Sequence, residues 1–75
     1  MINMMELKLN KHIFDGFAIE TAISAYKGLA TIDLLDGIDH WICSFSDCEY
    51  PEKLTAFEFE NYVIDLMNSK HYDDN

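Results

Sequence analysis

The chain has 75 residues, with fourteen acidic residues against five basic ones and a formal net charge of −9. A chain this short buries only about 60–65% of the surface that its unfolded form exposes, which excludes two separate cores and predicts one domain over residues 1–75. All five basic residues are lysines, so the guanidinium group that pairs with phosphate or guanine is missing. The charge therefore argues against direct nucleic-acid binding. It favours solubility, or a partner with a basic surface.

The composition also bears on where the protein works. No apolar run approaches the roughly 20 residues needed to cross a bilayer, so a membrane-spanning protein is not expected. The first residues do not combine a basic stretch, an apolar run and a cleavage site, as a secretory signal does. Two cysteines, Cys43 and Cys48, do not make a disulfide framework. We therefore expect a cytoplasmic protein with reduced thiols.

The first predicted element is a strand over residues 6–14. Apolar and polar side chains alternate there, with Leu7, Leu9 and Ile13 on one side. Lys11 interrupts the apolar side. This interruption predicts that the strand bends or frays near its end.

A helix is predicted next, because apolar residues no longer occur at every second position and instead recur every three to four positions, as on one side of a helix. Asp15 is the expected N-cap, and Gly28 the expected C-terminal stop. One arc of this helix is apolar and predicts its buried face: Ala18, Ile19, Ala22, Ile23, Ala25, Tyr26 and Leu29.

From Ala30 the period returns to two, and Asp36-Gly37 predicts a hairpin between residues 30–35 and residues 38–46. Whether the loop has two residues or four, the same side chains of the two strands share a face of the sheet. Either loop gives one core face: Ala30, Ile32, Leu34, Trp41, Cys43 and Phe45. The opposite face is mostly polar and carries Leu35 and Ile42 as apolar exceptions, so it is open to solvent or to a partner.

The polar residues 46–53 predict a loop that leads into a second helix. Thr55 and Glu58 form a capping-box pattern, while Leu54 and Phe59 are spaced for a hydrophobic staple. The helix is expected to begin at about Ala56 and to end at Ser69 or Lys70. The ordered domain then covers approximately residues 6–70, followed by a tail over residues 71–75.

These elements predict an α+β fold in the order β-α-β-β-α, with a three-stranded sheet and two helices packed on one face. The second helix is apolar over a wider arc than such a sheet requires. Phe57 and Ile64 lie on a flank about 80–100° from Ala56, and only Glu60 interrupts the arc between them. Two explanations stay open: the first helix covers this flank, or the flank is an exposed interface.

Catalytic and metal chemistry would most simply use His40, Cys43 and Cys48. Strand parity points His40 and Cys43 to opposite faces of the sheet, and the spacing does not match a structural zinc site. Cys48 lies beside Asp47 and Glu49, which disfavours its thiolate. No phosphate-binding loop is present. We therefore expect no catalytic residue, no metal and no cofactor, and the chain is not expected to be an enzyme.

Scattered positions along most of the chain nevertheless resemble a known family. They are Ile13-Phe14, Ala18-Ile19, Ala22 through Tyr26, the hairpin with Trp41, Phe59-Glu60-Asn61 and Asp65-Leu66. In these positions and in its order of elements, the chain resembles HxsD, the small accessory protein of His-Xaa-Ser radical-SAM peptide-maturation systems. The arginine of the family's last-helix signature is absent here. The resemblance implies a noncatalytic helper that works beside a radical-SAM enzyme and a precursor peptide.

The leading hypothesis is thus a noncatalytic module that binds a protein or peptide through five residues: Phe57, Glu60, Ile64, Leu35 and Ile42. An alternative is an acidic inhibitor whose carboxylates imitate phosphates and occupy the basic groove of a nucleic-acid enzyme. A further alternative is a homo-oligomeric structural domain, such as a homodimer, that uses the same flank.

Overall fold

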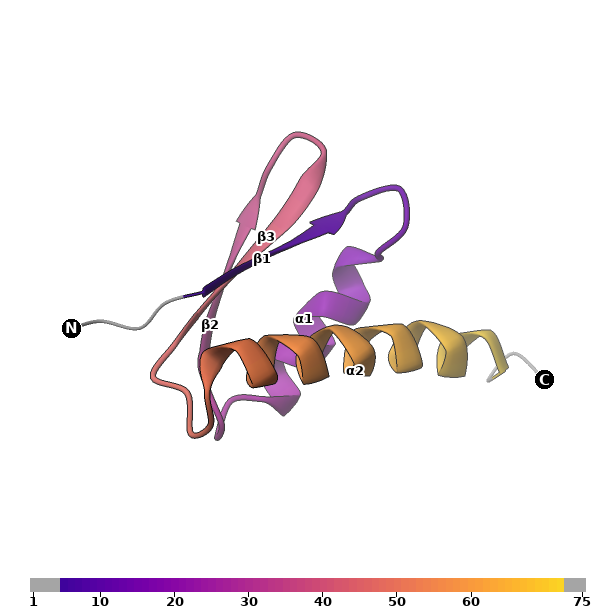
Figure 1. Cartoon of the computed structure of the whole chain (residues 1–75). Coiled ribbons are helices and arrows are strands. Elements are labelled where there is room, and N and C mark those ends of the chain that lie inside the picture. Colours follow the sequence, from indigo (N-terminus) through magenta and orange to yellow (C-terminus); the bar gives the residue numbers. More distant parts are fainter. Residues whose placement is uncertain (1–4, 73–75) are drawn as a thin grey trace.

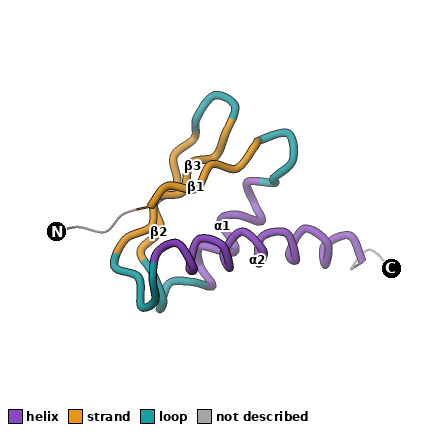
Figure 2. Tube along the Cα trace, in the orientation of Figure 1, coloured by secondary structure: helices purple, strands orange, loops and turns teal. Residues whose placement is uncertain are grey.

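A computed structural model describes residues 5–72 and contains, in that range, three strands and two helices (Figure 1). The elements are β1 (Met5–Asn10), α1 (Gly16–Ala25), β2 (Thr31–Asp36), β3 (His40–Ser46) and α2 (Glu52–Tyr72). Both helices lie on the same side of the sheet (Figures 1 and 2). The predicted α+β class and the order β-α-β-β-α are confirmed.

β3 is the central strand, because the order in the sheet is β1-β3-β2 and both pairings are antiparallel. β1 and β2 therefore run parallel to each other on opposite edges, with α1 connecting them. Leu7 and Leu34 lie on either side of Cys43, and Asp36 pairs with Trp41. Four residues, 37–40, therefore separate the last paired residues of the hairpin, as in the longer of the two predicted loops, and the predicted parity is preserved. The last of them, His40, already belongs to β3 and pairs with Asn10 of β1.

The core lies between the sheet and the helices. Its buried members come from all the elements except β2: Leu9, Ala18, Ile19, Ala22, Cys43, Phe45, Ala56, Phe59 and Val63. The rings of Phe45 and Phe59 meet edge to face, with centroids 5.3 Å apart. This contact joins the centre of the sheet to α2.

β1 is shorter than predicted and ends at Asn10, before Lys11. The chain then turns, with the Phe14 N–H donating to the Asn10 carbonyl, and Ile13 is exposed. Placing Ile13 on the buried side was therefore wrong, although the predicted bend near Lys11 is confirmed. Lys11 lies over the Trp41 ring, with its Nζ 4.6 Å from the ring centroid, and forms an ion pair with Asp36.

α1 begins as predicted, because the Asp15 side chain accepts a hydrogen bond from the Phe17 N–H at 3.2 Å. It ends earlier than predicted, at Ala25, and both Ala25 and Leu29 are exposed. The main-chain N–H groups of Leu29 and Ala30 donate to the Tyr26 carbonyl, so Gly28 lies inside the turn that follows the helix. Gly28 is therefore not the predicted stop.

α2 begins at Glu52 and not near Ala56, so the predicted capping box and staple were wrong. The buried Thr55 lies within the first turn, where its N–H donates to the Pro51 carbonyl at 2.9 Å. Pro51 lies just before the helix, where its missing N–H removes no helical hydrogen bond. The helix continues to Tyr72, beyond the predicted end, so residues 71 and 72 are helical. The rest of the predicted tail, residues 73–75, lies outside the described residues.

A candidate functional site between β1 and α2

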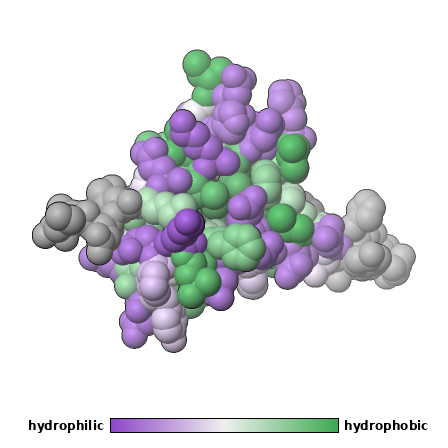
Figure 3. Space-filling model, viewed as in Figure 1, coloured by the Kyte–Doolittle hydropathy of each residue, from purple (hydrophilic) through white to green (hydrophobic). Residues whose placement is uncertain are grey.

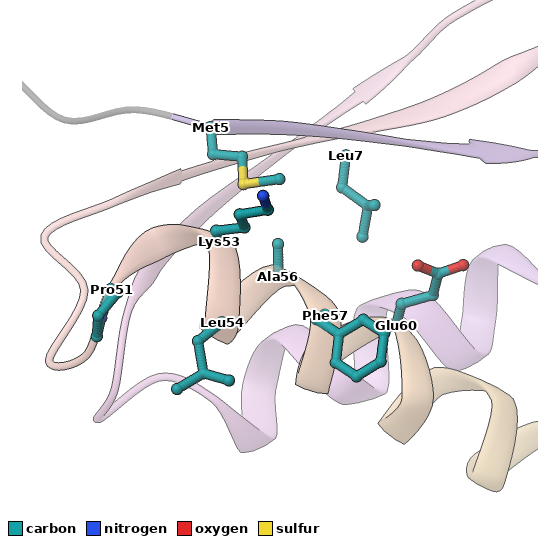
Figure 4. A pocket seen from close by; sticks show the side chains of 8 residues that line it. All are labelled: Met5, Leu7, Pro51, Lys53, Leu54, Ala56, Phe57 and Glu60. Carbon is teal, nitrogen blue, oxygen red and sulfur yellow. The ribbon is translucent and has the colours of Figure 1, made fainter.

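A groove of about 510 Å³ runs between β1 and the first turns of α2 (Figure 4). Strand β1 supplies Met5 and Leu7, whose side chains point toward the helix. Pro51 lies just before α2, and the remaining lining residues are on the helix: Lys53, Leu54, Ala56, Phe57 and Glu60. Most of these side chains are apolar, so the groove suits an apolar group of a ligand or partner.

The groove opens past the free edge of β1. Its lining contains β1 residues but no residue of β3, β2 or α1. β1 pairs with β3 on one side and, within residues 5–72, with no strand on the other. An unpaired strand edge presents main-chain N–H and C=O groups that another strand can bind. The hollow and the free edge are therefore parts of one surface.

Phe57 is the one aromatic residue that lines the groove, and its side chain is 64% exposed. Its neighbour in the groove, Glu60, is half-buried and has no ion pair among the described residues. Lys53 and Glu60 lie at opposite ends of the groove, with Ala56 and Phe57 between them (Figure 4). Figure 3 shows apolar surface reaching solvent between the start of β1 and the start of α2. The groove is thus an apolar hollow with one charge of each sign at its ends.

The packing of α1 explains why this side of α2 is open. Tyr26, at the end of α1, contacts Phe59 and Tyr62 of α2, with ring centroids 5.4 Å and 5.7 Å apart. These contacts occupy a different side of α2 from Phe57. Of the two explanations for the apolar flank, α1 therefore does not cover Phe57. Ile64 is half-buried and does not line the groove, so the predicted flank is only partly continuous.

The other predicted partner-binding residues, Leu35 and Ile42, lie on the opposite face of the sheet. They are cross-strand neighbours on β2 and β3, and Leu35 is exposed while Ile42 is half-buried. Lys8 of β1 is the other neighbour of Ile42. This small apolar pair is separated from the groove by the thickness of the sheet, so the five predicted residues do not form one surface.

The two thiols are both disfavoured as nucleophiles. Burial raises the pKa of the Cys43 thiol to about 11. The pKa of Cys48 is raised by partial burial and by the nearby carboxylates of Glu52 and Asp47, against a hydrogen bond with Thr55 that lowers it. Cys43 has core parity, whereas His40 shares the opposite face with Ile42. These residues therefore provide no paired thiol and base.

Six of the groove residues were not predicted as site residues: Met5, Leu7, Pro51, Lys53, Leu54 and Ala56. The wide apolar arc of α2 indicated that this side of the helix could bind a partner. Which strand lies beside it depends on the order of the strands in the sheet, and the sequence pattern does not give that order. No known protein-family model, curated protein or solved structure matches the chain.

Proposed function

We propose that this chain is a noncatalytic interaction module that receives an apolar side chain of a partner protein or peptide in the groove between β1 and α2. The free edge of β1 would bind the partner's main chain beside that anchor, as in strand addition. An acidic surface, with a net charge of −9, suits a partner that carries lysine or arginine near its apolar anchor.

The observation that carries this proposal is the exposure of Phe57 within an apolar hollow. Phe57 is 64% exposed, although a phenylalanine side chain is among the largest apolar surfaces that a residue can bury. Met5, Leu7 and Leu54 extend the same surface. Concave apolar surfaces beside an open strand edge favour binding over simple solvation.

A noncatalytic role is supported by the chemistry of the thiols and by the placement of His40. The raised pKa values of Cys43 and Cys48 keep both thiols protonated at neutral pH. Both cysteines are free, which supports a reducing location, and we place the protein in the cytoplasm. The resemblance to HxsD would make the partner a radical-SAM enzyme or its precursor peptide.

The test is affinity purification of the tagged chain from its native host after chemical cross-linking, with the bound proteins identified by mass spectrometry. The Phe57→Asp variant is expected to lose the specific partner, because a carboxylate in the apolar hollow is costly to desolvate. The matched control is Phe17→Asp on α1, where the phenylalanine is 68% exposed and outside the groove. Equal retention of the partner by both variants would exclude the groove as its binding site.

A further inference from the structure

We infer that the groove and the free edge of β1 bind a second copy of this chain, in a two-fold symmetric dimer. The inference rests on the proposed function, since it names the partner of the same surface. Two copies would join their sheets through antiparallel pairing of β1 with β1. A two-fold interface of this kind requires a surface that is complementary to itself. Both layers of the surface, the strand and the helix, meet that requirement.

The charge pattern of β1 selects one register. In antiparallel pairing centred on Leu7, Glu6 of each copy lies opposite Lys8 of the other, and this favourable pair occurs twice. Centring the pairing on Lys8 would place two lysines opposite each other, and centring it on Glu6 would place two carboxylates opposite each other. Like charges in those positions are destabilising. The strand is therefore self-complementary about Leu7.

The main-chain groups agree with this register. The Lys11 N–H donates to the Asp39 carbonyl of the neighbouring chain segment at 3.0 Å. Bonded pairs alternate along an antiparallel ladder, so Leu9, Leu7 and Met5 also direct their main-chain groups toward β3. Glu6 and Lys8 consequently direct theirs toward the free edge. The two residues whose charges match across the axis are thus the residues that have main-chain groups available for pairing.

The α2 residues that line the groove are also complementary to their own copies across the two-fold axis. Leu7 lies above the groove near Ala56 and Phe57, between Lys53 at one end and Glu60 at the other (Figure 4). A two-fold axis through Leu7 makes the two α2 helices run in opposite directions. It brings Lys53 of each copy toward Glu60 of the other, and the two Phe57 rings toward the centre. The second copy would therefore cover the apolar hollow and provide a cation for the half-buried Glu60 carboxylate.

The experiment uses complementary charge reversal on the full chain, measured by sedimentation velocity over a range of concentrations. Glu6 and Lys8 are both exposed on the outer face of the sheet, so their substitution leaves the core intact. Wild type is expected to show a monomer–dimer equilibrium. Glu6→Lys and Lys8→Glu, each measured alone, are expected to dimerise about tenfold more weakly, because two attractive pairs become repulsive. An equimolar mixture of the two variants restores opposite charges at both pairs and is expected to recover the dimer.

Each other outcome decides against the inference. A wild-type chain that remains monomeric up to about 1 mM would overturn it. A wild-type dimer that neither single reversal weakens would place the interface elsewhere and also overturn it. If the chain is monomeric and Phe57→Asp still loses a different captured protein, the dimer fails while the proposed function stands. If the chain is monomeric and Phe57→Asp loses nothing, both fail.

Discussion

Phe57 and Phe59 differ by two positions on the same helix and have opposite surroundings. Phe59 is fully buried, with the rings of Phe45 and Tyr26 against it, whereas Phe57 is 64% exposed at the groove. Two positions along a helix correspond to a rotation of about 200°, so one phenylalanine faces the sheet and α1 while the other faces past the edge of β1. The comparison shows that α2 has two apolar sides. One holds the domain together, and the other is exposed at the groove.

The largest expected effect is the difference in free energy of unfolding between truncating the buried phenylalanine of α2 and truncating the exposed one. Phe59→Ala is expected to lower the free energy of unfolding by about 3–5 kcal/mol, because it leaves a cavity among tightly packed rings. Phe57→Ala is the matched control and is expected to change it by less than about 0.5 kcal/mol. Urea unfolding of both variants measures the difference. Similar losses in the two variants would mean that Phe57 also supports the core.

The second effect concerns the buried Cys43 thiol, whose titration reports how well the core excludes water. The pKa of Cys43 is raised from 9.0 to about 11 by burial, so the folded protein holds this proton more tightly than the unfolded chain does. This difference of two pKa units contributes about 2–3 kcal/mol to the free energy of unfolding. The contribution is complete below pH 9 and is lost as the pH rises through about 11. Urea unfolding at several pH values measures the decline, which Cys43→Ala is expected to reduce.

The control for this titration is Cys48→Ala, which removes the half-buried thiol and leaves Cys43 in place. Tyrosines and lysines that titrate in the same pH range contribute equally to the stability of each variant and of wild type, so the comparison removes their contribution. An unchanged alkaline decline in Cys43→Ala would show that the Cys43 thiol is not shielded from water.

A smaller effect is expected at Ile64, which lies on the same side of α2 as Phe57 but is half-buried. Ile64→Ala is expected to cost about 1 kcal/mol, less than a fully buried isoleucine because part of the side chain already contacts water. Thermal unfolding provides the measurement. A loss as large as that of Phe59→Ala would place Ile64 in the core.

The smallest effect on stability is expected from Phe57→Asp, within about 0.5 kcal/mol of wild type. The same variant is expected to lose the partner, because the carboxylate replaces the apolar anchor. Circular dichroism with thermal unfolding checks the stability, and analytical ultracentrifugation checks association. A strongly destabilised variant would assign Phe57 to the fold and remove its role as a binding residue.

Local patterns in the sequence predict much of this fold. Asp15 caps α1 as expected, the bend at Lys11 is present, and the hairpin pairs Leu34 with Cys43 on the core face. The errors lie where two local signals compete. Thr55 matches a capping box, but the helix starts one turn earlier, at Glu52 just after Pro51, so the threonine lies inside it. Ile13 continues an apolar alternation, but β1 has already ended.

The sequence by itself determines the alternation of the strands, the two apolar sides of α2 and the acidic surface, because each depends on residue spacing or charge alone. Only the tertiary structure decides that Phe57 lies in a groove. Phe57 and Leu7 are fifty residues apart, and they meet because β3 lies between β1 and β2 and leaves β1 at the edge above α2. Strand order follows from how the whole chain buries its apolar surface, which no local pattern specifies.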